Sequence, residues 1–301
     1  MKKTALLISA ILLMSSVSIS TNAQAIVKEV GPSDATPGLF VNVDGSRVHY
    51  RNYGGGDEAI VFVHGWTCDM SFWGGQWYPF SKLKPTILID LPGHGKSDEP
   101  QIAYSMDLFA RAVKAVLDDA QVKRAVLVGH SMGTPVIRQF YRKYPKETAA
   151  IVIVDGMLRP FADKKMMDAL IASLRGPDYA EAAGRFVDGM LTPVKSAKLR
   201  EEIKTSMLST PQHVAVSAME AMADPAIWTE DKIDVPVLAV LEKSPFWPAD
   251  NEKFFRSLAH DLDYQMWDGA SHFLMMEDPD KFNRALATFL VKIKFIKEVK
   301  R

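Results

Sequence analysis

One serine of this chain lies in a pattern that suits nucleophilic catalysis. Ser131 stands in the sequence Gly129-His130-Ser131-Met132-Gly133, between an apolar run of strand length and a stretch with helical periodicity. A strand–serine–helix turn of this G-x-S-x-G kind is so sharp that side chains on either flank would collide with the backbone, while the serine hydroxyl is thrust outward. We therefore expect Ser131 to be a nucleophile at the end of a strand.

A base for this serine is indicated at His272. Among the seven histidines, it has the best spacing, because it follows a strand-like segment, residues 263–267, and a glycine, Gly269. It would therefore lie on a loop at the end of the sheet where Ser131 emerges. His130 is adjacent to the serine, but its side chain must point away from that of Ser131. A histidine that takes the serine proton lets the oxygen attack an acyl carbon.

Backbone donors for the charge that develops in such a reaction are indicated at Trp66 and Met132. The apolar run 59–63 ends in His64-Gly65-Trp66. Because the strand is followed by His-Gly, we expect the backbone N–H groups of Trp66 and Met132 to point toward the same position. Two such donors form an oxyanion hole. We expect His64 to brace this loop and border the substrate rather than act as a base.

Apolar runs of strand length alternate with amphipathic helical stretches. The strand-like runs are residues 39–43, 47–52, 59–63, 86–89, 125–128, 151–154, 237–241 and 263–267. The helical stretches include residues 106–117, 134–144 and 281–295. Asp44-Gly45, between the first two runs, suits a type I′ hairpin turn. Because continuous apolar runs are typical of parallel strands buried on both faces, the alternation predicts an α/β fold with a doubly wound sheet.

One interval breaks this alternation. Residues 156–234 contain no strand-like run, only helical stretches at 164–174, 180–190 and 195–208. This interval is far too long for a loop of a compact domain, so it predicts a helical insertion within a core formed by residues 26–155 and 235–301. Its methionines indicate either a Met-filled helical core or an adaptable apolar lid over a pocket.

These motifs together resemble those of the α/β-hydrolase family. The His-Gly pair, the loop Asp90-Leu91-Pro92-Gly93-His94-Gly95-Lys96-Ser97, the Gly-His-Ser-Met-Gly turn and the segment Gly269-Ala270-Ser271-His272-Phe273 occur in the order and spacing of that family. The resemblance runs from Phe40 to the C-terminus. It implies an eight-stranded, mostly parallel sheet with a helical cap after the sixth strand, with Ser131 as nucleophile and His272 as general base.

The acid that supports the histidine is where the sequence departs from the family pattern. Most members place it after the strand that follows the cap, where Ser244 and Pro245 stand in this chain. A second position in the family is the end of the strand before the cap, occupied here by Asp155. Neighbouring strands lie about 4.8 Å apart, so a carboxylate at either tip reaches the same imidazole. We favour Asp155, with Glu242 and Asp250 as alternatives, while a helix N-cap is the other interpretation of Asp155.

Composition excludes several classes of protein. The 301 residues include 36 basic and 36 acidic side chains, and this balance argues against a nucleic-acid partner, which requires a basic surplus. Cys68 is the single cysteine, so no internal disulfide can form. No Cys/His spacing typical of a metal site occurs. We expect neither a metal nor a cofactor.

The N-terminus has the pattern of a secretory signal. Lys2 and Lys3 precede a short apolar run, residues 5–14, and Ala23-Gln24-Ala25 supplies small residues for cleavage after Ala25. No cysteine lies near the cut, so we expect no lipid anchor. The sequence thus predicts that residues 1–25 are removed and that the mature protein is periplasmic or secreted.

The expected activity is that of a carboxylesterase-like serine hydrolase. Four residues are expected to border the substrate: His64, Trp66, Phe246 and Trp247. Their largely aromatic character favours an apolar or aromatic ester or a lactone as the substrate. A serine nucleophile argues against haloalkane dehalogenase or epoxide hydrolase chemistry, for which the family uses aspartate. The alternatives are a small-molecule receptor with slow turnover and a cofactor-free peroxidase or perhydrolase that uses the same site.

Overall fold

The strands form a single sheet in the order β1-β2-β4-β3-β5-β6-β7-β8. The computed structural model describes residues 34–297, so the signal peptide predicted at residues 1–25 lies outside the described residues. The strands are β1 (Leu39–Val43), β2 (Ser46–Tyr53), β3 (Glu58–Val63), β4 (Thr86–Ile89), β5 (Arg124–His130), β6 (Thr148–Val154), β7 (Val237–Glu242) and β8 (Leu262–Trp267). Only β1–β2 and β2–β4 pair antiparallel, and the other neighbours pair parallel. The prediction of a mostly parallel, eight-stranded sheet is confirmed.

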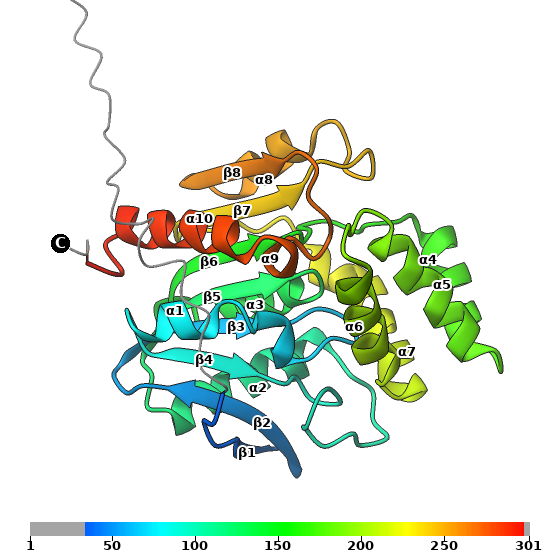
Figure 1. Ribbon diagram of the computed structural model, residues 1–301, viewed down its shortest axis with the longest axis horizontal. Coiled ribbons are helices and arrows are strands. Elements are labelled where there is room, and N and C mark those ends of the chain that lie inside the picture. Colours follow the sequence, from blue (N-terminus) through cyan, green and yellow to red (C-terminus); the bar gives the residue numbers. More distant parts are fainter. Residues whose placement is uncertain (1–33, 298–301) are drawn as a thin grey trace, which may run out of the picture.

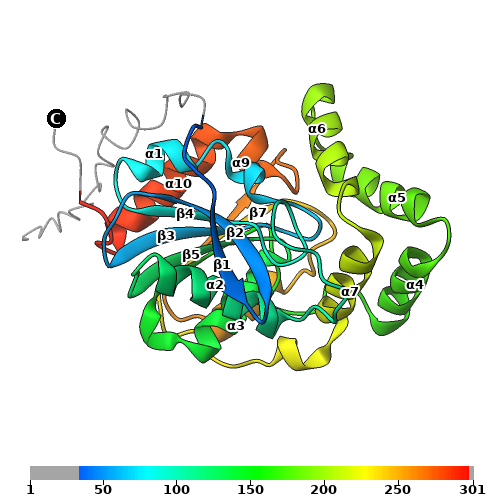
Figure 2. The same cartoon turned by 90° about the horizontal axis from the view of Figure 1, so that it is seen from below.

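Helices cover both faces of this sheet, as a doubly wound fold requires. In Figure 2, α1 (Trp77–Ser81) and α10 (Pro279–Lys292) lie on one face, and α2 (Met106–Asp119) and α3 (Gly133–Lys143) lie on the other. The core strands are consequently buried on both sides, and every residue of β4 and β6 is buried. The remaining core elements are η2 (Met70–Trp73), η3 (Pro145–Glu147), α8 (Asn251–Leu258) and α9 (Leu274–Glu277).

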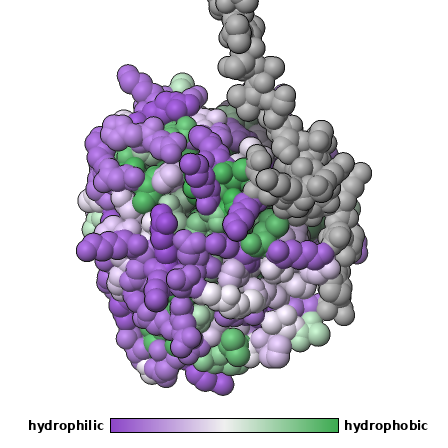
Figure 3. Space-filling view, turned by 90° about the vertical axis from the view of Figure 1, so that its left-hand side faces the viewer, coloured by the Kyte–Doolittle hydropathy of each residue, from purple (hydrophilic) through white to green (hydrophobic). Residues whose placement is uncertain are grey.

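The segment between β6 and β7 is helical in the structure. It contains α4 (Lys164–Arg175), α5 (Tyr179–Leu191), α6 (Ala197–Leu208), α7 (Gln212–Ala223) and η4 (Pro225–Trp228). These elements lie within the interval 156–234 expected for the cap, and they stand beyond the end of the sheet toward which the parallel strands point (Figure 1). Figure 3 shows the end of the molecule remote from these helices, where hydrophilic side chains predominate.

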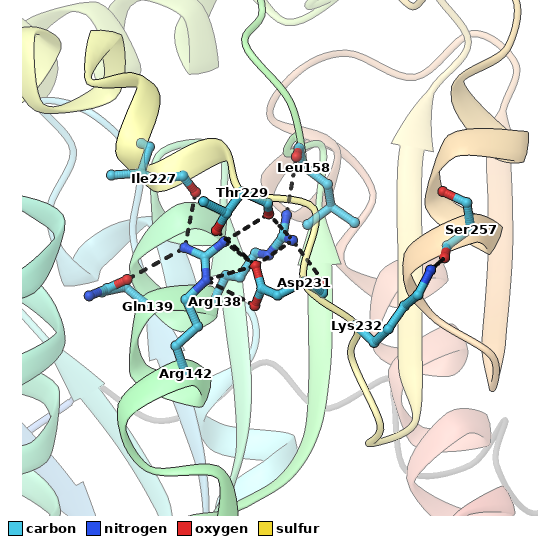
Figure 4. Close-up of polar contacts among 9 residues, drawn as sticks. All are labelled: Arg138, Gln139, Arg142, Leu158, Ile227, Thr229, Asp231, Lys232 and Ser257. Atoms are coloured by element: carbon cyan, nitrogen blue, oxygen red, sulfur yellow. Dashed lines mark hydrogen bonds and ion pairs between the residues drawn. The ribbon is translucent and has the colours of Figure 1, made fainter.

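Two arginines of α3 hold the segments that connect the cap to the core. Arg138 donates hydrogen bonds to the carbonyl oxygens of Leu158 (3.1 Å), on the segment that enters the cap, and of Thr229 (2.6 Å), on the segment that leaves it. Its guanidinium also contacts the Asp231 carboxylate at 3.2 Å, and Arg142 contacts the same carboxylate at 2.7 Å (Figure 4). Burial and the neighbouring Arg142 lower the pKa of Arg138 to about 10, which leaves it charged at neutral pH.

Replacing Arg138 should destabilise the fold strongly. Arg138→Met would leave the buried carbonyl oxygen of Leu158 without its donor and would remove one of the two cations that hold Asp231, so we expect the free energy of unfolding to fall by about 3 kcal/mol. Urea denaturation of the purified protein measures this loss. The matched control is Arg175→Met, which breaks an exposed ion pair with Glu220 and should cost less than about 1 kcal/mol. Equal losses for the two variants would contradict a special role for Arg138.

Candidate active site

Ser131 lies on a strained turn between β5 and α3. Its φ of 51° is in the left-handed region, which non-glycine residues rarely occupy and which often marks functional sites. A Cβ atom on Gly129 would lie 2.5 Å from the carbonyl oxygen of Gly133, and one on Gly133 would lie 2.5 Å from the carbonyl oxygen of Val63. Glycine is therefore required on both sides of the serine, as the sequence motif indicated.

His272 and Asp155 are in direct contact, although 117 positions separate them in the chain. The distance from His272 Nδ1 to Asp155 Oδ2 is 2.6 Å, and the Asp155 side chain is 2% exposed. Asp155 follows β6 directly, and its other carboxylate oxygen accepts a hydrogen bond from the backbone N–H of Glu242 at 2.7 Å. Both oxygens are thus held. Because Nδ1 faces the carboxylate, Nε2 is the ring nitrogen that remains to take a proton.

The two alternative acids lie in different surroundings. Asp250 is on the surface, where its side chain is 63% exposed and pairs with Arg159 at 2.6 Å. The structure therefore does not bring Asp250 to His272. Glu242 is the last residue of β7 and lies beside Asp155, but the carboxylate in contact with the His272 ring is that of Asp155.

The loop after β3 packs against the serine turn. A Cβ atom on Gly65 would lie 3.1 Å from the Cβ atom of Ser131, so the His64-Gly65-Trp66 segment runs directly beside the candidate nucleophile. Met132 is the N-cap of α3, and backbone N–H groups at a helix N-terminus lack acceptors within the helix. These are the positions from which the backbone N–H groups of Trp66 and Met132 could stabilise an oxyanion.

His64 differs from its expected place beside the substrate. It is fully buried, with its Nδ1 donating to the carbonyl oxygen of Gly65 (2.8 Å) and its Nε2 accepting from the N–H group of Leu91 (3.0 Å). Both ring nitrogens are therefore engaged, and burial lowers the pKa of the imidazole. The expectation that His64 braces the loop fits this geometry, but its expected contact with substrate does not.

His130 has a supporting position that sequence reasoning missed. It is fully buried, and its Nε2 donates to the backbone carbonyl oxygen of His272 at 2.8 Å. Burial, together with the nearby His272, holds the pKa of His130 well below its usual range, so it remains a neutral brace for the loop that carries His272. The sequence signal for this role is the position of His130, directly before Ser131 and at the end of a strand that must be buried.

A cavity of about 580 Å³ contains this cluster. Ser131, Asp155 and His272 line it, as do Trp66, Phe246 and Trp247, the residues expected to border the substrate. Trp66 also reaches the cap, because its Nε1 donates to the carbonyl oxygen of Ala215 at 2.8 Å. The cap side of the cavity is rich in methionine, contributed by Met157, Met190, Met207, Met219 and Met222.

Cys68 also lines the cavity, but its environment favours the thiol. The side chain is buried, and burial raises its pKa well above the usual range. The Sγ atom lies 3.4 Å from the carbonyl oxygen of Trp66, to which the thiol can donate. A thiolate nucleophile needs the opposite environment, one that lowers its pKa, so Cys68 acts here as a packing residue beside the Trp66 loop.

Glu242 has an unusual environment for a carboxyl group. Its side chain lines the cavity, and burial, together with the neighbouring Asp155 carboxylate, raises its pKa to about 7. The ordinary pKa of a glutamate is 4.5. Between pH 4.5 and about pH 7, the native state therefore keeps a proton on Glu242 that the unfolded chain has released. Stability must therefore fall as the pH rises through this window.

Replacing Glu242 with glutamine should remove this loss. Relative to the wild type, we expect Glu242→Gln to gain stability as the pH rises from 4.5 to about 7. The gain should reach about 2 kcal/mol after allowance for solvent in the cavity, and should be constant above that pH. Urea denaturation at a series of pH values measures the difference. A difference that does not change with pH would contradict the raised pKa.

Within residues 34–297, no three His, Cys, Asp or Glu side chains are grouped so that they could hold a metal ion. In the same part of the chain, no helix combines the length and the apolar character needed to cross a bilayer.

Comparisons with known proteins identify the family. A model of the alpha/beta hydrolase family matches residues 60–285, which is most of the chain. This chain therefore belongs to the alpha/beta hydrolase family, and its fold is that of a hydrolase.

Individual relatives differ in activity. The chain is 26% identical over 281 residues to a 2-hydroxy-6-oxononadienedioate/2-hydroxy-6-oxononatrienedioate hydrolase of Paraburkholderia phymatum, a match that covers 86% of this chain and 97% of that protein. The solved structure of Est816, described as an N-acyl homoserine lactone degrading enzyme, is 29% identical, with a TM-score of 0.69 over 83% of this chain and 100% of that chain.

A further match is local. The chain is 32% identical over 127 residues to the dihydrolipoyllysine-residue acetyltransferase component of the acetoin cleaving system of Cupriavidus necator. The match covers 42% of this chain and 34% of that protein, so it spans about a third of the length of that relative.

Proposed function

We propose that this protein is a serine hydrolase that cleaves a carboxylic ester or lactone of an apolar or aromatic small molecule. The observation that carries the proposal is the 2.6 Å contact between His272 and Asp155, made in a cavity that Ser131 also lines. These are the three side-chain types that acyl transfer by a serine requires, with the acid buried behind the base.

The proposed mechanism uses each group in a distinct role. His272 Nε2 takes the proton of Ser131 as the serine oxygen attacks the acyl carbon, while Asp155 fixes the ring orientation and stabilises the imidazolium that forms. The N–H groups of Trp66 and Met132 bind the oxyanion. His272 then returns the proton to the leaving oxygen, and water, activated by the same histidine, releases the acyl group from Ser131.

The cavity lining supports the proposed substrate class. Its walls combine aromatic side chains with methionines, which re-pack easily around apolar groups of different shapes. The resemblance to a lactone-degrading enzyme over 83% of the chain supports including lactones with esters. A serine at position 131 favours hydrolysis through an acyl-enzyme.

Hydrolysis of a defined ester panel tests the proposal. We expect the purified protein to hydrolyse neutral 4-nitrophenyl esters of short and medium acyl chains, with a lower kcat/KM for esters that carry a fixed charge. Turnover no faster than the spontaneous rate for every ester and lactone in the panel would instead favour the receptor alternative, in which the same cavity binds a small molecule without converting it. Oxidation of halide by peroxide with no ester turnover would favour the peroxidase alternative.

The proposed cellular location is the periplasm or the exterior of the cell. It rests on the N-terminal pattern of residues 1–25, with cleavage after Ala25 and no lipid anchor. N-terminal sequencing of the protein recovered from the periplasmic fraction should read from Ile26. Recovery of the uncleaved chain from the cytoplasm would contradict this location.

A further inference from the structure

Glu242 places a polar group in the wall of an otherwise largely apolar cavity. It ends β7, and its half-buried side chain lines the same cavity as Ser131 and His272. Its backbone N–H group donates a hydrogen bond to the carboxylate of Asp155. Within residues 34–297, however, its carboxyl group has neither a hydrogen-bond donor nor a cation in contact with it.

The charges around this carboxyl group come from three elements. Asp155, after β6, and Glu277, on α9, are carboxylates that disfavour a second negative charge nearby, whereas His272 favours it. Arg185, on α5, also lines the cavity but pairs with Glu181, and Lys195 and Lys243 have other partners. Lys195 Nζ donates to the carbonyl oxygen of Gly269 (3.3 Å), and Lys243 Nζ lies 3.7 Å from an oxygen of Asp268.

This environment stabilises the protonated carboxyl group. Burial and the two acidic neighbours raise the pKa of Glu242 to about 7, so the neutral form is well populated near neutral pH. An apolar substrate that fills the cavity would displace water and raise the pKa further, because burial penalises the charged form. A neutral carboxyl group has an O–H donor, which an ionised one lacks.

We propose that Glu242 is a substrate-recognition residue that donates an O–H hydrogen bond to a second oxygen acceptor of the substrate, a carbonyl group apart from the one that Ser131 attacks. The inference rests on the proposed function and narrows its substrate class to keto-substituted or similar dicarbonyl esters and lactones. Once a substrate fills the cavity, a donor without a partner costs free energy, and a site built around such a donor discriminates against substrates that cannot accept its hydrogen bond.

Matched ester pairs test this assignment. 4-Nitrophenyl hexanoate and 4-nitrophenyl 5-oxohexanoate differ by one carbonyl on the acyl side, and 4-ethylphenyl and 4-acetylphenyl hexanoate differ by one on the alcohol side. The ratio of kcat/KM within each pair is compared between the wild type, Glu242→Gln and Glu242→Leu, so that differences in intrinsic reactivity cancel. Glutamine keeps a donor of similar shape, whereas leucine removes it.

We expect the preference of the wild type for the keto ester to fall about fivefold in Glu242→Leu for at least one pair, and to be kept in Glu242→Gln. In the wild type the preference should also decline between about pH 6 and about pH 8.5, as the carboxyl group ionises, whereas in Glu242→Gln it should not change with pH. A purely structural role for Glu242 would not produce this difference between the two pH profiles.

Two results would overturn the inference. One is the same keto preference in the wild type and in folded Glu242→Leu for both pairs. The other is a preference for the cationic 4-nitrophenyl 6-aminohexanoate that both variants lose, because it would make Glu242 an ionised anchor for an amine. If the wild type hydrolyses none of these esters, the proposed function fails as well, whereas unchanged ratios with rapid hydrolysis overturn the role of Glu242 alone.

Discussion

Replacing Ser131 with alanine should lower kcat for 4-nitrophenyl butyrate by about four to six orders of magnitude. The variant keeps the cavity and the oxyanion donors but loses the oxygen that forms the acyl-enzyme, so only weak residual catalysis by binding and electrostatics remains. Alanine adopts the strained backbone conformation at this position, with φ of 51°, at a cost in free energy similar to that of serine. The fold should therefore survive.

Initial-rate kinetics measure this loss, and a thermal melt of the same sample checks the fold. The matched control is Ser173→Ala on α4, which removes an exposed hydroxyl that donates only to the carbonyl oxygen of Leu170 in the same helix and should leave kcat unchanged. If Ser131→Ala retained turnover within about tenfold of the wild type, Ser131 would not be the nucleophile.

Replacing Asp155 with asparagine should lower kcat by about two to four orders of magnitude. The amide has nearly the same shape and can still accept the N–H group of Glu242. It cannot supply negative charge at 2.6 Å from His272 Nδ1, and an amide NH₂ group turned toward the ring would favour the tautomer that carries its proton on Nε2. His272 could then no longer take the proton of Ser131.

Asp250→Asn provides the matched control for this substitution. Asp250 pairs with Arg159 on the surface, so the same chemical change there should leave kcat within about twofold of the wild type. Near-normal turnover of Asp155→Asn, combined with a severe loss in Glu242→Gln, would instead assign the acid to Glu242.

The arrangement of strands could be predicted closely from the sequence because parallel strands buried on both faces leave a continuous apolar signature. Residues 86–89 form β4 without any shift, and the run 151–154 is extended at its N-terminal end to Thr148 in β6. The pair Asp44-Gly45 has φ values of 52° and 88°, as a type I′ turn requires.

Helices without a clear polar face were harder to predict. In α7, Val214, Ala215, Ala218 and Met219 are all buried, because the helix packs between the core and the rest of the cap. Such a helix lacks the one-sided apolar stripe by which amphipathic helices are identified. The sequence therefore indicated a helical cap but not this element of it.

Within the site, local motifs indicated the proposed reacting side chains better than the residues that support them. Ser131 and His272 lie in motifs of a few residues, whereas the burial of His64 depends on its contact with Leu91, 27 positions away. The support that His130 gives to His272 spans 142 positions. Contacts of this kind depend on how loops from different strands pack together, which no local pattern contains.

The same limit applies to charged side chains inside the fold. Arg138 could have been noticed as a cation on the apolar side of the helix that follows Ser131, beside Ile137 and Tyr141. Its acceptors, however, belong to the two segments that enter and leave the cap. Only the assembled structure shows that one side chain holds both.

The most direct test of the proposed serine chemistry is covalent labelling with a fluorophosphonate probe, followed by peptide mapping by mass spectrometry. The phosphorus centre is attacked only by a serine whose base and oxyanion donors are in place. We predict rapid labelling confined to Ser131, abolished in Ser131→Ala and strongly slowed in Asp155→Asn. A folded wild-type protein that is not labelled, or is labelled at another residue, would contradict the assignment of Ser131 as the nucleophile.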